Sequence, residues 1–338
     1  MDQIINLLRE KDNFVIASHI GPDGDAIGSS FGLAMALNKL GKNVTVALET
    51  YPTKYNIVPG REFLYDFNKP LANNVFIALD CADTERLGFA RPFFHKAKST
   101  ICIDHHATNP GFAIHNFIDP DASSTAEMVL LVIEALVDLD IDIATAIYTG
   151  IVSDTGGFKY ASTSTSTMQA AIRLMETGIP FTDIYNEVMH KHSFEASKAL
   201  GLALEASQLI FNGDVVYTCL TREMLAAAGA DSAEMDNVVE YLMSTRGAKV
   251  ALFLYERHQT IKSASPLIES TQEPPNGLKK IKVSMRSKEI DVSNIALSLG
   301  GGGHKMAAGC TLVGTMESVL KQVLDIVKKE LQSKENIV

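Results

Sequence analysis

The first half of the chain alternates short apolar runs with longer segments of helical periodicity. Runs at 13–18, 43–48, 75–79 and 100–103 have the length and composition of buried strands. A helical segment at 26–40 lies between the first two runs and ends before Gly41, a residue type common just after a helix. Strands that alternate with helices pair in parallel. We therefore expect an α/β domain with a mainly parallel sheet flanked by helices, including helices at 123–137, 141–152, 166–177 and 181–189.

The pattern changes after Gln208. Strands expected at 215–220, 250–255 and 281–285 mix with short helices, and an amphipathic helix covers 316–331. The polar segment 256–280 contains three prolines and a glycine and is expected to be a loop or a disordered insertion. We assign residues 1–190 to a larger domain, 191–207 to a helical linker and 208–338 to a smaller α/β domain, with the active site in the cleft between the two domains.

Polar side chains follow three of the expected strands and one helix. Each group alone is explained by a turn or a helix cap. Parallel strands, however, bring their carboxyl ends to one edge of a sheet, where ligands bind. We therefore expect these residues to converge: His19, Asp23 and Asp25 after the first strand, Asp80 after the third, Asp104-His105-His106 after the fourth, and Asp154 at a helix end.

The convergent residues have the chemistry of metal ligands. Carboxylates suit Mg²⁺ and Mn²⁺, whereas imidazole favours later transition metals. Two Mn²⁺ ions are the expected cofactors, with Mg²⁺, Co²⁺ or Fe²⁺ as alternatives. A pair of ions about 3.5–4 Å apart can activate a water and hold a phosphoryl group.

Two local patterns complete this half of the chain. Gly28 and Gly32 are small residues in the first turns of the helix at 26–40, and we expect them to let that helix lie close to the sheet. Ser124 and Glu127 have the spacing of a capping box at the start of the next helix.

Composition limits the function classes. The net charge of −10 and the pI near 5.4 argue against a broad surface for long duplex nucleic acid. Four cysteines without a CxxC spacing indicate neither a disulfide framework nor a zinc knuckle, which favours a cytoplasmic protein. No stretch approaches the roughly 18 apolar residues of a membrane span, so no membrane partner is expected.

These motifs, in this order, resemble the DHH phosphoesterase family, which is named for the triplet at Asp104-His105-His106. The later half resembles the DHH-associated domain through the run Gly300-Gly301-Gly302-Gly303-His304 and the following Ala307-Ala308-Gly309. The resemblance spans nearly the whole chain.

The resemblance implies a role for each site residue. His19 and Asp23 would hold one metal ion, Asp25, His105 and Asp154 the other, and Asp80 would bridge them. Asp104 would orient a neighbouring ligand, and His106 would face the scissile phosphate. Substrate would be bound by Arg286 and Ser284 and by the run Gly301, Gly302, Gly303 and His304. Consecutive backbone N–H groups of Gly300 to Gly303 could surround a phosphate.

The implied activity is hydrolysis of short oligoribonucleotides, of 3′-phosphoadenosine 5′-phosphate, or of both, through a water activated by two metals. One alternative is a phosphodiesterase for cyclic di-AMP or linear dinucleotides. A non-enzymatic alternative is a nucleotide sensor on the same fold. The expected partners are a short RNA or a nucleotide, with a homodimer as a further option.

Overall fold

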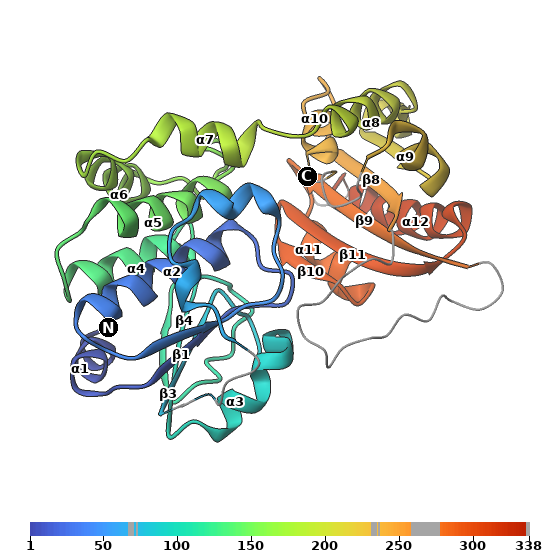
Figure 1. The fold of residues 1–338 in the computed structure, drawn as a ribbon. Coiled ribbons are helices and arrows are strands. Elements are labelled where there is room, and N and C mark those ends of the chain that lie inside the picture. Colours follow the sequence, from blue (N-terminus) through green and yellow to red (C-terminus); the bar gives the residue numbers. More distant parts are fainter. Residues whose placement is uncertain (67–70, 72–73, 231–234, 236, 258–277, 336–338) are drawn as a thin grey trace. The chain divides into compact units, whose positions relative to one another are not determined.

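The computed structural model describes residues 1–66, 71, 74–230, 235, 237–257 and 278–335. The chain divides into two compact units between Lys191 and His192 (Figure 1). Helix α8 (Phe194–Glu205), in the segment expected to be a linker, buries Ala196, Ala199 and Ala203 in a core of the second unit.

The first unit is built on a parallel sheet, as predicted. The strand order is β2-β1-β3-β4-β5, and every neighbouring pair is parallel. Four of the strands correspond to the expected runs, whereas β5 had no counterpart because its sequence is half polar and it lies at the sheet edge. The strands are β1 (Phe14–Ala17), β2 (Val44–Ala47), β3 (Val75–Leu79), β4 (Ser99–Asp104) and β5 (His115–Ile118).

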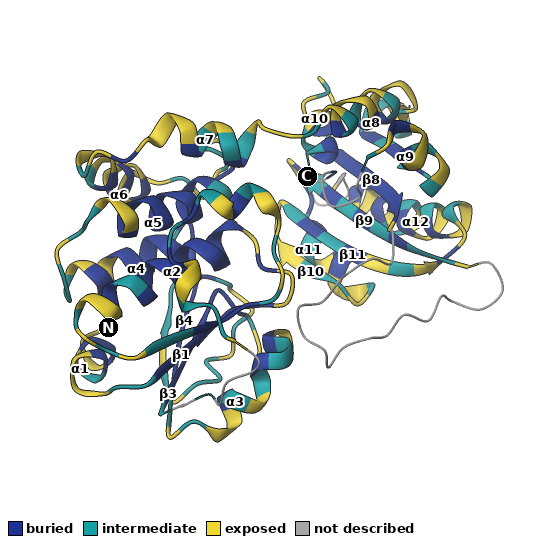
Figure 2. Ribbon diagram, viewed as in Figure 1, coloured by how far each residue is buried: buried dark blue, intermediate teal, exposed yellow. Residues whose placement is uncertain are grey.

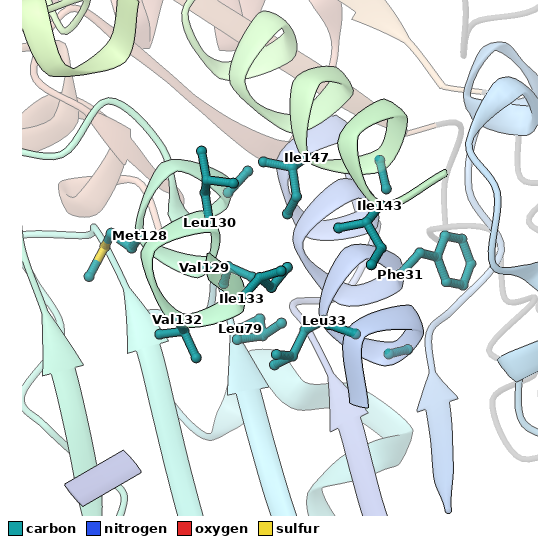
Figure 3. Close-up of a cluster of buried hydrophobic side chains, with 14 of the residues drawn as sticks. Phe31, Leu33, Leu79, Met128, Val129, Leu130, Val132, Ile133, Ile143 and Ile147 are labelled. Atoms are coloured by element: carbon teal, nitrogen blue, oxygen red, sulfur yellow. The ribbon is translucent and has the colours of Figure 1, made fainter. Parts of the chain in front are cut away.

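Alternate residues of these strands enter two different cores. Ile16, Ile77 and Ile103 belong to a core shared with α2, α4 and α5, which Figure 3 shows above the strands. Val15 and Phe76 face a smaller core that includes Phe94 of α3. Both faces of the sheet are therefore covered, and the central strands are buried along their length (Figure 2). The helices are α1 (Asp2–Glu10), α2 (Gly24–Lys39), α3 (Arg91–Lys96), α4 (Thr125–Glu134), α5 (Ile141–Asp154), α6 (Thr165–Glu176) and α7 (Phe181–Met189), with short 3₁₀ turns at Thr53–Ile57, Arg61–Phe63 and Glu85–Ala90.

The small residues of α2 serve a different contact from the one expected. A Cβ atom at Gly28 would lie 2.3 Å from the carbonyl oxygen of Ala146, and one at Gly32 would lie 2.6 Å from the side chain of Ile147. Both neighbours belong to α5, so the glycines let α2 approach another helix and not the sheet. This contact brings the start of α2 beside the end of α5.

The second unit contains a mixed six-stranded sheet of order β10-β11-β9-β8-β7-β6, in which β7 and β8 are parallel and the other pairs antiparallel. One face packs against α11 and α12 and the other against α8, α9 and α10. The elements are β6 (Gln208–Ile210), a 3₁₀ turn (Phe211–Gly213), β7 (Val215–Leu220), α9 (Arg222–Ala228), α10 (Val238–Met243), β8 (Val250–Glu256), β9 (Lys279–Ser287), α11 (Val292–Ser298), β10 (Gly302–His304), β11 (Ala307–Gly314) and α12 (Met316–Glu335).

The expected loop at 256–280 is shorter than predicted at both ends. Glu256 is the buried last residue of β8, and Lys279 and Lys280 open β9. Residues 258–277 lie outside the described residues.

Among the helices that the structure describes, none has both the length and the apolar character of a membrane span.

Candidate metal centre

Three parallel strands and two helix ends of the first unit bring eight predicted residues together. His19 follows β1, Asp80 follows β3, and Asp104 ends β4 directly before His105 and His106. Asp23 and Asp25 begin α2, and Asp154 ends α5. Donor atoms from these residues lie within 4.8 Å of one another in several overlapping groups. The sequence prediction that they converge is therefore confirmed.

His19, Asp23 and Asp80 form the first group. The His19 Nδ1 lies 3.0 Å from the carbonyl oxygen of Ile20, and since a carbonyl only accepts, Nδ1 carries the hydrogen. The other ring nitrogen, Nε2, lies 3.5 Å from Asp80 Oδ2 and 3.9 Å from Asp23 Oδ1. Nε2 thus faces two carboxylates and could share an ion with them, as expected of a metal ligand whose second nitrogen is anchored.

His105, Asp25 and Asp154 form the second group and repeat this arrangement. The His105 Nδ1 donates to the carbonyl oxygen of Ala122 at 3.2 Å, while Nε2 lies 3.3 Å from Asp154 Oδ2. Two ligands that share an ion at about 2.0–2.2 Å lie roughly 3–4.4 Å apart. The separations of 3.5, 3.9 and 3.3 Å given above fall within this range.

Asp80 connects the two groups. Its Oδ2 faces His19, whereas its Oδ1 lies 3.8 Å from His105 Nε2. The residue is almost fully buried and has a left-handed backbone with φ of 52°. Such a conformation is uncommon for a residue with a side chain and tends to occur at functional sites. Asp80 Oδ1 also lies 3.6 Å from His106 Nδ1, so one oxygen of Asp80 faces His19 and the other faces both His105 and His106.

The buried carboxylates cannot all remain charged without a compensating cation. Burial, together with the nearby charges of Asp80, Asp154 and Asp23, raises the pKa of Asp25 well above its ordinary value. Burial also raises the pKa of Asp154 to about 7, although His105 opposes this shift. Divalent cations would favour the ionised form of every carboxylate. An oxygen-rich donor set with one imidazole in each group fits Mn²⁺, Mg²⁺ or a similar ion.

Asp104 and His106 form a separate pair beside these groups. Asp104 is fully buried, and its Oδ1 accepts a hydrogen bond from His106 Nδ1 at 2.7 Å. Its Oδ2 accepts from the side-chain amide of Asn109 at 2.7 Å. Burial opposes protonation of His106, but the hydrogen bond with Asp104 and the charges of Asp80 and Asp104 outweigh it and raise the pKa of His106 to about 9. In the metal-free protein, the ring is therefore a cationic donor at neutral pH.

The N-terminus of α4 donates hydrogen bonds to two of the candidate ligands, Asp25 and Asp80. The backbone N–H groups of Thr125 and Ala126 donate to the two oxygens of Asp25 at 2.7 and 2.8 Å. The Thr125 hydroxyl donates to Asp80 Oδ1 at 3.2 Å, and the carbonyl of Ala122 holds His105. Sequence reasoning missed Thr125 and Asn109, because a polar residue in a loop or at a helix start carries no local signal of a partner elsewhere in the chain.

The predicted capping box at this helix is only half formed. The Ser124 hydroxyl accepts the N–H of Glu127 at 3.1 Å, as predicted. The Glu127 carboxylate, however, accepts from the backbone N–H of Ser123 at 3.2 Å and from its hydroxyl at 2.6 Å, and not from Ser124. Hydrogen bonds from Ser166 and Thr167 draw the carboxylate toward α6, which explains the difference.

A left-handed turn ends α5 directly after Asp154. Gly156, Gly157 and Phe158 have φ values of 58°, 70° and 65°. A Cβ atom at Gly156 would lie 2.5 Å from the ring of Tyr160, so glycine is required there for space as well as for conformation. The Thr155 hydroxyl also accepts the N–H of Phe158 at 3.0 Å. The turn thereby fixes the end of the helix that presents Asp154.

Comparison with known proteins agrees with this geometry. Residues 13–151 match the DHH family, N-terminal domain, and residues 212–333 match the DHHA1 domain. The chain is 33% identical over 321 residues to the bifunctional oligoribonuclease and PAP phosphatase NrnA of Thermus thermophilus, covering 94% of this chain and 89% of the relative. The chain belongs to the DHH family.

Two further relatives cover nearly the whole of this DHH-family chain. The Bacillus subtilis protein named bifunctional oligoribonuclease and PAP phosphatase NrnA is 26% identical, over 92% of each chain. The crystal structure of an exopolyphosphatase-related protein from Bacteroides fragilis superposes with a TM-score of 0.82 at 25% identity, covering 99% of this chain and 96% of that one.

The residues of this DHH-family protein that were predicted to bind substrate lie in the second unit. Ser284 and Arg286 are alternate residues of β9 and are paired across the sheet with Gly309 and Ala307 of β11. The Arg286 Nε donates to Glu240 of α10 at 2.5 Å, in a pair whose side chains are each 24% exposed. The pairing with Glu240 was not predicted, since the two residues are 46 positions apart.

The glycine run does not form the predicted series of free N–H groups. The N–H groups of Gly300 and Gly301 donate to the carbonyls of Leu297 and Ala296, which end α11. The next residues, Gly302 to His304, form β10 and pair with β11. A Cβ atom at Gly301 would lie 2.2 Å from the carbonyl oxygen of Gly309, so this glycine permits close contact between backbones. Capping and strand pairing therefore account for much of the run.

Proposed function

We propose that the chain is a divalent-metal-dependent phosphoesterase that hydrolyses short oligoribonucleotides and 3′-phosphoadenosine 5′-phosphate. The observation that carries the proposal is that Asp80 directs Oδ2 toward His19 and Oδ1 toward His105, and these two histidines belong to separate groups of metal-capable donors. Relatives that align over nearly the full length are named as oligoribonucleases and PAP phosphatases, which supports this substrate class.

His19 and Asp23 are proposed to hold one ion, Asp25, His105 and Asp154 the other, and Asp80 to bridge them. Mn²⁺ is the preferred ion, because each group combines carboxylate oxygens with one imidazole. When bound, the two ions would lower the pKa of a water and neutralise charge on the phosphoryl group. The hydrogen bonds that His19 and His105 donate to the carbonyl oxygens of Ile20 and Ala122 supply the fixed ring orientation that such ligands need.

His106 is proposed to donate a proton or a hydrogen bond to a phosphate oxygen through Nε2. Its Nδ1 is held by Asp104, whose other oxygen is held by Asn109. This series of hydrogen bonds fixes the plane of the imidazole and favours its protonated form. Asp104 therefore acts through His106 and has no direct role toward the substrate.

The second unit is proposed to bind the substrate, and the first, residues 1–190, to carry out catalysis. Arg286 can bind a phosphate through Nη2 while Glu240 holds Nε and the Met285 carbonyl accepts from Nη1 at 3.0 Å. Ser284 lies two residues away on the same face of β9. Gly301, Gly302, Gly303 and His304 would contribute through the hairpin of β10 and β11. We retain residues 208–338 as the substrate-binding domain and add α8 to it because of its packing.

We further propose a cytoplasmic location and a homodimer. The four cysteines are free thiols, which agrees with a reducing compartment.

The homodimer is proposed from an exposed face of α6. Met168, Ile172 and Met175 are exposed at helical spacing on this helix and offer an apolar face for a second copy. Light scattering combined with size-exclusion chromatography tests the homodimer directly, and a monomeric mass for the wild-type protein would refute it.

The function is tested with a substrate panel in the presence of Mn²⁺. The panel contains 3′-phosphoadenosine 5′-phosphate, RNA from dinucleotide to pentanucleotide, linear and cyclic di-AMP, pyrophosphate and single-stranded DNA. Release of mononucleotide from short RNA and of phosphate from 3′-phosphoadenosine 5′-phosphate is expected, and both should be lost in Asp80→Asn. Faster turnover of cyclic di-AMP or pyrophosphate would overturn the substrate assignment. Tight nucleotide binding without turnover would favour a sensor.

A further inference from the structure

Thr125 is the first residue of α4 and contacts two of the proposed ligands. Its side chain is fully buried. Its backbone N–H donates to Asp25 Oδ2 at 2.7 Å, and its hydroxyl donates to Asp80 Oδ1 at 3.2 Å. Asp25 and Asp80 come from different elements, α2 and the end of β3. One residue therefore joins carboxylates that the sequence separates widely.

The hydroxyl contact bears on the orientation of Asp80. A carboxylate can rotate about its Cβ–Cγ bond, so a bridging geometry requires that this rotation be restrained. On one side, Asp80 Oδ2 faces His19 Nε2. On the other, Oδ1 receives the Thr125 hydroxyl while also facing His105. The Thr125 hydroxyl thus restrains the plane of the Asp80 carboxylate, so that one oxygen stays directed toward His19 and the other toward His105.

The neighbouring contacts make this support rigid. Ala126 donates to the second oxygen of Asp25 at 2.8 Å, and the Ser124 hydroxyl caps the helix through the N–H of Glu127. The capped helix end therefore also fixes the carboxylate of Asp25, because both of its oxygens accept N–H groups of this helix end. The hydroxyl of Thr125 projects from this fixed backbone. Because rotation about χ1 is restricted in a β-branched side chain, few positions of the hydroxyl relative to Asp80 are available.

We propose that Thr125 is a positioning residue that orients Asp80 to bridge two divalent cations. The proposal rests on the metal-binding roles given above for Asp25 and Asp80. Without the hydroxyl, Asp80 would rotate more freely and both ions would be held less tightly. Groups that orient metal ligands typically contribute roughly 10- to 100-fold to metal affinity.

The test is titration calorimetry of the full-length protein with MnCl₂. Thr125→Val retains the branched shape and removes the hydroxyl, while Thr125→Ser retains the hydroxyl. Thr149→Val is the matched control, because the buried Thr149 hydroxyl donates to a backbone carbonyl, that of Thr145, at 2.8 Å. Thr125→Val should weaken Mn²⁺ binding by roughly 10- to 100-fold. Thr125→Ser and Thr149→Val should bind like the wild type.

Thermal unfolding of the metal-free variants separates positioning from loss of folding. Without metal, the Tm of Thr125→Val should be close to that of Thr149→Val. With Mn²⁺ added, the Tm of Thr125→Val should rise less than that of Thr149→Val. If Thr125→Val does not fold, Thr125→Ala is compared with Thr125→Ser, since that pair also differs by the hydroxyl. Unchanged Mn²⁺ affinity, or an equal loss in Thr149→Val, would overturn the inference. A third outcome separates the two proposals. If Thr125→Val loses Mn²⁺ affinity as expected but the wild-type protein hydrolyses no phosphate ester, the proposed function is refuted and the positioning role of Thr125 stands.

Discussion

The Glu127 carboxylate joins the start of α4, which holds Asp25, to α6. It accepts four hydrogen bonds: from the Ser123 N–H at 3.2 Å, the Ser123 hydroxyl at 2.6 Å, the Ser166 hydroxyl at 2.6 Å and the Thr167 hydroxyl at 2.9 Å. The residue is only 7% exposed, so solvent screens these bonds weakly. Replacing Glu127 with Gln retains its shape and removes its charge.

The expected loss follows from the hydrogen bonds. A bond to a charged acceptor contributes about 1.5–3 kcal/mol and a neutral bond about 0.5–1.5 kcal/mol. The Gln oxygen can take the place of Oε2, which accepts three of the four bonds. The Ser166 hydroxyl can then turn its hydrogen away and accept from the Gln NH₂ group. Weakening the two shortest bonds by about 1 kcal/mol each lowers the free energy of unfolding by about 2 kcal/mol. For a unit of this size, Tm should fall by about 4–8 °C.

The effect of pH provides a second signature. Burial opposes ionisation of Glu127, but the hydrogen bonds outweigh it and lower the pKa of its carboxyl from the ordinary value of 4.5. A group with a lowered pKa in the folded state contributes stability that is complete above the unfolded pKa and is lost as pH falls through the folded pKa. The difference between the wild type and Glu127→Gln should therefore be constant above about pH 5.5 and shrink below pH 4.5.

Calorimetric melts of both proteins from neutral to acid pH measure this difference. Glu134→Gln is the matched control, because Glu134 also joins α4 to α6, through Arg173 Nε at 2.7 Å, but with side chains 29% and 39% exposed. An exposed pair of this kind contributes at most about 1 kcal/mol. Equal losses in the two variants, or a Glu127→Gln difference that does not shrink in acid, would refute the reasoning.

Three other substitutions test the site and its supports. His106→Ala should leave Mn²⁺ content nearly unchanged and remove most turnover; an equal loss of metal in elemental analysis would make His106 a ligand. Arg286→Ala should chiefly raise KM for a dinucleotide, by roughly 10-fold or more for the loss of a charged phosphate contact, and an unchanged KM would exclude it from binding. Gly28→Ala places a methyl group 2.3 Å from the Ala146 carbonyl and should lower stability by about 1–3 kcal/mol in urea unfolding. A stability equal to wild type would show that α2 and α5 can separate freely.

The convergence of the candidate metal donors could be predicted because parallel sheets impose a geometric rule. His19, Asp80 and His105 each follow a strand, and the carboxyl ends of neighbouring parallel strands meet at one edge. The contacts that orient these donors could not be predicted in the same way. Thr125 and Asp25 are 100 positions apart, and neither is unusual in its local sequence.

Glycines gave misleading local signals for a related reason. A glycine records that space or a left-handed backbone is needed, but not which neighbour requires it. Gly28 was expected to accommodate the sheet and instead accommodates α5. Gly300 and Gly301 were expected to present N–H groups to a phosphate, yet those groups complete the hydrogen bonding of α11. Only the tertiary arrangement distinguishes these uses.

The geometry of the candidate metal centre also depends on a residue with no polar side chain. A Cβ atom at Gly150 of α5 would lie 2.6 Å from Ala126 Cβ and 3.1 Å from Asp25 Oδ1. Gly150 therefore marks the point where α2, α4 and α5 meet. Any side chain there would push the start of α4 away from Asp25 and lengthen the two N–H contacts that hold its carboxylate. Close helix packing is thus a condition for the ligand geometry, because the N–H groups of one helix must reach the carboxylate of another.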